Sequence, residues 1–230
     1  MAVFSHLLQL FFPRTCLSCK EILSEGEKYI CHRCLAKLPY TGYRLDDKND
    51  IYKQIIPFVE IEAATSLLFF SKQGMVQELM HQLKYKGHQE IGTLFGEILG
   101  NRILKENPLL NIDLVVPVPL HPKKLKQRGY NQLTEFGKKL SEKLQAGFEE
   151  NLLLKIKQNE TQTKKNALER KQNVKGMFGL NNPGRFKNKH ILLIDDVITT
   201  GATLVEAAGE LKKTEAIKIS VATIATADQL

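Results

Sequence analysis

The stretch KHILLIDDVITTGATLVEAA, residues 189–208, decides the fold. Four apolar residues run directly into Asp195 and Asp196, and a short segment rich in threonine and glycine follows. Beyond Gly201 the apolar residues recur at helical spacing. A short apolar run bounded by turn residues is typical of a buried strand. The stretch therefore predicts a buried strand over 189–195, a tight turn, and a helix over about 201–213.

The residue types in this turn indicate the chemistry of a ligand. In an open parallel sheet, ligands bind beyond the carboxyl ends of the strands. The free N–H groups at a helix N-terminus bind phosphate, and Gly201 lets the backbone come close. Carboxylates would repel a phosphate, but they accept hydrogen bonds from the sugar hydroxyls beside it. The turn therefore predicts a ribose 5-phosphate ligand, and it is no Walker-type loop because GK[ST] is absent.

Strand and helix patterns alternate along the rest of the chain. Strands are predicted at 62–70, within 111–122, at 151–157 and at 216–226. Two consecutive helices are predicted between residue 75 and Asn107-Pro108, and a further helix is predicted over 130–146. Residues 41–57 are expected to form a polar connector and residues 158–178 a long mobile loop. Alternation of this kind predicts an α/β fold with a parallel sheet and right-handed crossovers. We expect three regions: an N-terminal helix and metal module at 1–42, a connector and hood-like region at 43–110, and an α/β core at 111–230.

All four cysteines fall in two CxxC pairs, Cys16 and Cys19, then Cys31 and Cys34. This spacing brings four thiolates to the corners of a tetrahedron, which suits a structural Zn²⁺. Two disulfides or a redox CxxC are the alternatives, but nothing in the sequence points to secretion, and thiols stay reduced in the cytosol. His32 is a conceivable substitute ligand, although we expect it to be exposed.

The formal net charge of +8 is concentrated in one segment. Residues 121–175 hold fourteen Lys and Arg against six Asp and Glu, and the rest of the 230 residues is balanced. A concentrated positive field predicts an anionic partner, either a phosphate-bearing metabolite or nucleic acid, although a solvated lysine surface is equally common. No apolar run approaches the ~18 residues that span a bilayer, and the N-terminus has no signal-peptide pattern, so we expect a cytoplasmic protein without stable membrane insertion.

A family resemblance adds to this interpretation. ILLIDDVITTGAT resembles the motif of type I phosphoribosyltransferases that binds phosphoribosyl diphosphate (PRPP). The CxxC pairs, LKYKGH, VVPVPLHPKKLKQRGYNQ and TQTKKNALERKQNVKGMF resemble, in the same order, the competence-associated ComF family. The resemblance covers nearly the whole chain and implies a type I phosphoribosyltransferase-like sheet flanked by helices, with a small N-terminal zinc module.

The resemblance also implies roles for individual residues. The two acids would bind the ribose 2- and 3-hydroxyls, and the diphosphate loop would follow an early strand at Val118 and Pro119. A flexible loop at about 157–175, carrying Arg170, would close over PRPP, and Mg²⁺ would arrive with PRPP itself. The residues expected to bind PRPP are Asp195, Asp196, Thr199, Thr200, Gly201, Ala202, Thr203, Val118, Pro119 and Arg128, and those expected to act in catalysis are Asp195, Asp196 and Arg170.

Two functional hypotheses follow. In the first, the protein acts in DNA uptake and natural transformation with a DNA-translocating ATPase and contacts single-stranded DNA. The expected contacts are Lys123, Lys124, Lys126, Arg128, Lys164 and Lys165, and Tyr130 and Phe178 could stack bases, although burial is the more common role of such rings. In the second, the protein is an active phosphoribosyltransferase that moves phosphoribosyl from PRPP to a nitrogenous acceptor. Lys84 and Lys86 in LKYKGH are weaker candidates for phosphate contact.

Overall fold

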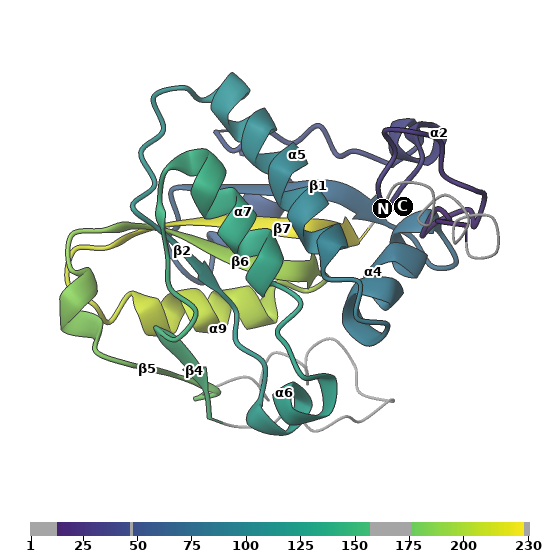
Figure 1. Ribbon diagram of the computed structural model, residues 1–230. Helices are drawn as coiled ribbons and strands as arrows, with labels where there is room; N and C mark the ends of the chain where they lie inside the picture. The colour runs from purple at the N-terminus through teal and green to yellow at the C-terminus, as the bar shows by residue number, and fades with distance from the viewer. Residues whose placement is uncertain (1–12, 47, 157–175, 228–230) are drawn as a thin grey trace.

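The centre of the computed structural model is a parallel sheet built from distant parts of the chain (Figure 1). The structure describes residues 13–46, 48–156 and 176–227. Within them, five strands pair in the order β1-β7-β6-β2-β3, and every pair is parallel. The strands are β1 (Ala63–Phe70), β2 (Leu114–Pro117), β3 (Gly147–Phe148), β6 (His190–Ile198) and β7 (Lys218–Ala227). The predicted parallel α/β sheet is confirmed.

Helices cover both faces of this sheet. Helices α5 (Glu90–Glu106) and α7 (Thr134–Leu144) lie on one face and α9 (Ala202–Leu211) lies on the other (Figure 1). Gly96 lets α5 and α7 approach closely, because a Cβ at this position would lie 2.6 Å from the carbonyl oxygen of Phe136. The apolar strand residues, Ile191 to Ile194 among them, are fully buried between the two layers.

Among the described residues, four short helices were not predicted from the sequence. Helix α2 (His32–Ala36) lies in the cysteine module, the 3-10 helix η1 (Pro183–Phe186) precedes β6, and the other two begin at cap residues. The expected connector at 41–57 contains α3 (Asp50–Ile55), which Asn49 caps by accepting hydrogen bonds from the backbone N–H groups of Ile51 and Tyr52. The proline-rich loop after β2 is followed at once by α6 (Pro122–Arg128), capped by His121 and opened by a proline at its first position. Asn49 at the cap of α3 and Pro122 at the first position of α6 are ordinary start signals for a helix, but the helices are too short to show a periodic apolar pattern.

Strand-like residues at 151–157 form β4 (Leu153–Lys155), which lies outside the main sheet. Strand β4 pairs antiparallel with β5 (Phe178–Leu180) in a separate two-stranded sheet. The last residue of the expected long loop at 158–178 therefore begins a strand, and residues 158–175 of that loop lie outside the described residues.

The cysteine-containing N-terminal region packs on the edge of the main sheet through α4 (Met75–Tyr85) and β1. Lys20 forms a 3.3 Å ion pair with Glu78 of α4. The carbonyl oxygen of Pro39 accepts a 2.7 Å hydrogen bond from the N–H of Phe69, so the connecting chain covers the otherwise open edge of β1. The helix expected within residues 1–12 lies outside the described residues.

The region expected as a connector and hood at 43–110 supplies β1 and α5 to the central layers. Among the residues that the structure describes, no helix is both long and apolar enough to cross a membrane.

Candidate functional site

The turn after β6 borders a small cavity at the N-terminus of α9. The cavity has a volume of about 30 Å³ and is lined by Asp195 and by residues 197–204. Gly201 has a φ of 71°, in the left-handed region that favours glycine, and the helix begins at the next residue. The side-chain amide of Gln54, on α3, donates a 2.7 Å hydrogen bond to the carbonyl oxygen of Thr199. Helix α3 therefore holds the turn in place, a contact that the sequence did not reveal.

The two aspartates lie within β6, two or three residues before its end, rather than beyond it. Successive side chains of a strand point to opposite faces. Asp195 borders the cavity of the turn, whereas Asp196 contacts residues that precede α7 and end α4. The backbone N–H of Asp196 donates a 2.8 Å hydrogen bond to Oδ1 of Asp195. Burial, followed by the neighbouring charge of Asp196, raises the pKa of Asp195 to about 7.

Asp196 is engaged by two donors from other elements. Its Oδ2 lies 2.8 Å from the Nζ of Lys84 and accepts a 2.7 Å hydrogen bond from the amide of Gln132. Arg128 donates in turn to the side-chain oxygen of Gln132. Lys84, which the sequence offered only as a weaker candidate for phosphate contact, thus contacts Asp196 directly, whereas Arg128 is linked to Asp196 through Gln132. Lys86 is exposed at the end of α4.

The predicted diphosphate loop leaves the sheet beside β6. The N–H of Val118 donates a 2.9 Å hydrogen bond to the carbonyl oxygen of Ile194, and Val118 is buried. Pro119 lines a cavity of about 690 Å³ together with Lys155 of β4. Burial lowers the pKa of Lys155, and the charges of the two aspartates oppose this shift. Lys155 was not predicted from the sequence, where its signal was a single cation in the apolar run LLLKI.

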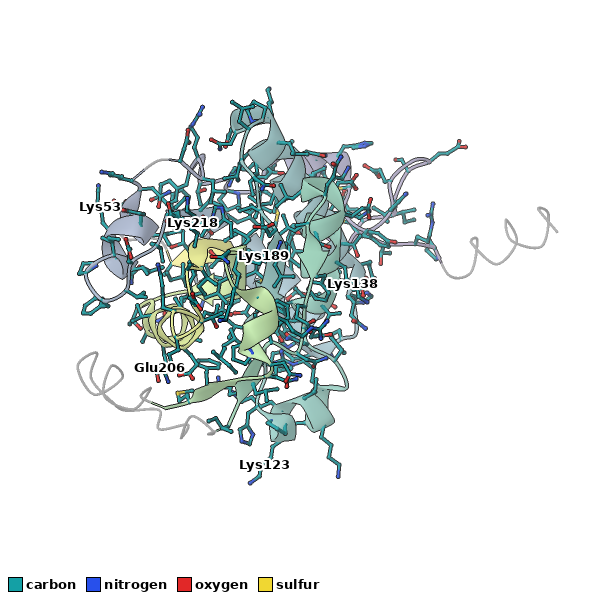
Figure 2. All side chains as sticks on the ribbon, turned by 90° about the vertical axis from the view of Figure 1, so that its left-hand side faces the viewer. Lys53, Lys123, Lys138, Lys189, Glu206 and Lys218 are labelled. Atoms are coloured by element: carbon teal, nitrogen blue, oxygen red, sulfur yellow. The ribbon has the colours of Figure 1, made fainter. Side chains whose placement is uncertain are left out.

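The expected nucleic-acid residues that are described gather on α6. Lys123, Lys124 and Lys126 are exposed, and Figure 2 shows Lys123 projecting away from the body of the protein. Arg128 is partly buried. Lys164, Lys165 and Arg170 lie outside the described residues.

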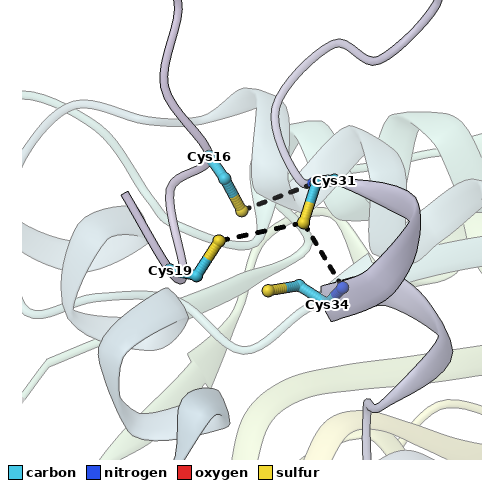
Figure 3. Close-up of side chains that lie close together, drawn as sticks. All are labelled: Cys16, Cys19, Cys31 and Cys34. Atoms are coloured by element: carbon cyan, nitrogen blue, oxygen red, sulfur yellow. Dashed lines mark hydrogen bonds between the residues drawn. The ribbon is translucent and has the colours of Figure 1, made fainter. Parts of the chain in front are cut away.

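The four cysteines converge as their spacing predicts (Figure 3). All four Sγ atoms lie within 4.8 Å of one another, and the Sγ atoms of Cys19 and Cys31 are 3.8 Å apart. A tetrahedron of sulfurs at ~2.3 Å from Zn²⁺ has edges of roughly 3.8 Å, so the donors fit this ion. The N–H of Cys31 also donates to the Sγ of Cys16 at 3.3 Å, which favours a thiolate. All four are free thiols rather than disulfides, and His32 is exposed.

Two families match the chain. The phosphoribosyl transferase domain matches residues 134–229 and the double zinc ribbon domain matches residues 7–44. They confirm the predicted fold class, a phosphoribosyltransferase-like sheet with an N-terminal zinc module.

Three curated relatives span different shares of the chain. The DNA utilization protein YhgH of Escherichia coli is 30% identical over 146 residues, which cover 62% of this chain and 63% of that protein. Competence protein F of Haemophilus influenzae is 27% identical over 92% of this chain and 96% of its own length. Competence protein ComFC of Bacillus subtilis is 27% identical over 92% of this chain and 83% of its own length. The match to the Escherichia coli protein thus spans less than two thirds of that relative.

Among solved structures, the glutamine PRPP amidotransferase from B. subtilis is similar over 63% of this chain and 30% of that chain, with 16% identity and a TM-score of 0.42.

Proposed function

The chain belongs to the ComF family, and on this premise we propose that it acts in DNA uptake or DNA use through two surfaces. One is a PRPP pocket formed by the turn at 199–203 and the two aspartates. The other is a single-strand DNA contact surface on the basic helix α6. A DNA-translocating ATPase of the competence system is the proposed protein partner.

The observation that supports the PRPP pocket is the position of Asp195. Asp195 and the N-terminal turn of α9 line the same small cavity, and Gly201 immediately precedes the first residue of the helix. A 5-phosphate placed on the N–H groups of α9 would bring its own ribose against Asp195. The carboxylate accepts hydrogen bonds from ribose hydroxyls, and it does so best when ionised.

In this proposal the contacts of Asp196 rearrange when PRPP binds. In the free protein Asp196 accepts from Lys84 and Gln132 at 2.8 and 2.7 Å. A ribose hydroxyl competes for the same carboxylate, and Lys84 can then turn toward the anionic diphosphate. The Mg²⁺ that accompanies PRPP would neutralise part of the diphosphate charge, and Asp195 and Asp196 offer the oxygen ligands that such a hard cation prefers.

The charge of α6 supports the DNA contact. Helix α6 spans seven residues, four of which are Lys or Arg, and its three lysines are exposed. A row of exposed cations binds the phosphates of any sequence, and such binding weakens steeply as salt displaces it. The lysines are therefore expected to contribute affinity without sequence preference.

Calorimetric titration with PRPP and Mg²⁺ tests the pocket. The wild-type protein should release or absorb heat on binding, and Asp195→Asn/Asp196→Asn should bind at least about tenfold more weakly, since charge-assisted hydrogen bonds are lost. A wild-type protein that gives no heat at any pH between 6 and 8 refutes the PRPP proposal.

An active phosphoribosyltransferase is the second candidate. The observation that favours it is a cavity of about 570 Å³ next to the aspartates. Lys84 lines this cavity, and its Nζ lies 2.8 Å from Oδ2 of Asp196, so the cavity has room for a nitrogenous acceptor beside the proposed PRPP pocket. Diphosphate release from PRPP, measured with a panel of purines, pyrimidines and amines, tests this function. Release with one acceptor supports catalysis. Silence across the panel, with salt-sensitive single-strand binding intact, favours the DNA-binding function alone.

A further inference from the structure

The cavity of about 570 Å³ lies between the end of α4 and the helix α6. Its lining is aromatic and cationic, with Lys84, Tyr85, Gly87, Lys124, Gln127, Arg128 and Tyr130. The volume is within the range of small-molecule sites, and the lining contains no carboxylate. The cavity therefore suits a flat, electron-rich ligand joined to negative charge.

Tyr85 is the exposed ring of this cavity. It is 65% exposed and is the last residue of α4. The guanidinium carbon of Arg128 lies 5.2 Å from the centre of the Tyr85 ring. This guanidinium lies over the ring, and the His81 ring lies 5.2 Å away at an angle of 47°. The exposure of Tyr85 still leaves ring surface on which an unpaired base can stack, as bases do on aromatic and arginine side chains in single-strand binding proteins.

The two rings that the sequence offered as possible stacking partners, Tyr130 and Phe178, are unsuited to this task. Phe178 is buried, and the Nζ of Lys155 lies 5.3 Å from its ring centre. Tyr130 is partly buried, and its hydroxyl donates a 2.5 Å hydrogen bond to the carbonyl oxygen of Leu83. Tyr130 instead joins the wall formed by α6 to the last turn of α4, so the cavity is held open before a ligand arrives. A preformed site binds more tightly, because less conformational entropy is lost when the ligand binds.

From these contacts we propose that the cavity binds an unpaired base of single-stranded nucleic acid, stacked on Tyr85 beside Arg128. Lys124, which lines the cavity, and the exposed Lys123 and Lys126 bind the phosphates on either side of that base. The inference rests on the proposed DNA contact and names the residue that distinguishes a single strand from a duplex, whose bases have no free face.

Fluorescence anisotropy with a labelled oligothymidylate tests the inference. We expect Tyr85→Leu to weaken binding about tenfold, because the aromatic face is lost, and Tyr85→Phe to retain binding within about twofold, because the face is kept. The slope of affinity against salt should be unchanged in both, since no phosphate contact is removed, whereas Lys124→Ala should reduce that slope by about one. The matched control is Phe58→Leu, which removes a ring of similar exposure, 57%, after α3.

Further measurements separate the outcomes. Oligonucleotides with abasic sites should bind wild type and Tyr85→Leu equally, and Tyr85→Leu should bind PRPP as wild type does, which also shows that it is folded. Equal oligothymidylate affinity of wild type and Tyr85→Leu overturns the inference while leaving the DNA contact standing. A wild type that binds no oligonucleotide refutes the DNA contact itself. Displacement of the oligonucleotide by free bases assigns the cavity to a small-molecule base and overturns a strand as its ligand.

Discussion

Replacing Asp195 with asparagine should remove a pH dependence that this carboxyl group gives to the stability of the fold. Burial and the charge of Asp196 raise the pKa of Asp195 from 3.8 to about 7. The folded protein therefore holds a proton on this carboxyl group between pH 4 and 7, where the unfolded chain has released it. The free energy of unfolding must fall as pH rises through this window, because the folded protein then holds a poorly solvated charge next to Asp196.

The size of the effect follows from the shift. A difference of about three pKa units corresponds to about 4 kcal/mol across the whole window, at about 1.4 kcal/mol per unit. Between pH 5 and pH 8 the contribution of Asp195 should change by about 2–3 kcal/mol. Asparagine has nearly the same shape and does not titrate. We therefore expect Asp195→Asn to gain about 2–3 kcal/mol relative to wild type over the same pH interval.

Urea unfolding in the presence of Zn²⁺, at pH 5, 6, 7 and 8, measures this difference, and other titrating groups cancel because both proteins share them. Asp113→Asn is the matched control, since its pKa is lowered by a 2.8 Å hydrogen bond from the N–H of His190 and then by Lys189. Its contribution is present at neutral pH and is lost only in acid, so the control should lose stability at every pH tested. Parallel profiles for wild type and Asp195→Asn refute the reasoning.

Three further predictions concern packing, metal and ligand. Gly96→Ala should destabilise the protein by about 1–3 kcal/mol in the same unfolding assay, because its Cβ would lie 2.6 Å from the carbonyl oxygen of Phe136. Cys19→Ser should lose bound Zn²⁺ by metal analysis, and its N-terminal region should become more sensitive to proteolysis, since the metal holds a segment with little core of its own. Lys84→Met should weaken PRPP binding about tenfold by calorimetry, because the cation that is proposed to turn from Asp196 to the diphosphate is removed.

Each of these has a control in the chain. Gly209→Ala, in α9 with open space around its Cβ, should gain up to about 1 kcal/mol, and an equal loss in both glycine variants contradicts the packing argument. His32→Ala leaves all four thiols in place and should keep the metal; loss of Zn²⁺ there, with retention in Cys19→Ser, means that the ligand set is wrong. Lys86 is exposed near Lys84, and Lys86→Met should bind PRPP as wild type does. Equal weakening in both lysine variants would mean that the loss comes from the lower net positive charge and not from the position of Lys84.

The local elements of the site were predictable because their causes are local. The apolar run before Asp195 specifies a buried strand, Gly201 permits the left-handed turn, and the helix follows within one or two residues of the expected start. The two CxxC pairs converge because each knuckle places two sulfurs close together by itself. Asn49 and His121 also cap helices locally, but α3 and α6 are so short that periodicity could not reveal them.

The partners of these elements were decided only in three dimensions. Gln54 meets Thr199 across 145 positions of sequence and Gln132 meets Asp196 across 64. The ring exposed at the cavity is Tyr85, while Tyr130 and Phe178 are held by contacts that no spacing encodes. Backbone preference and apolar period act over a few residues, so the sequence by itself determined the strand, the turn, the helix and the thiol cluster. Which side chains surround them depends on the order of strands and on the packing of helices across the sheet, and only the tertiary structure decided that.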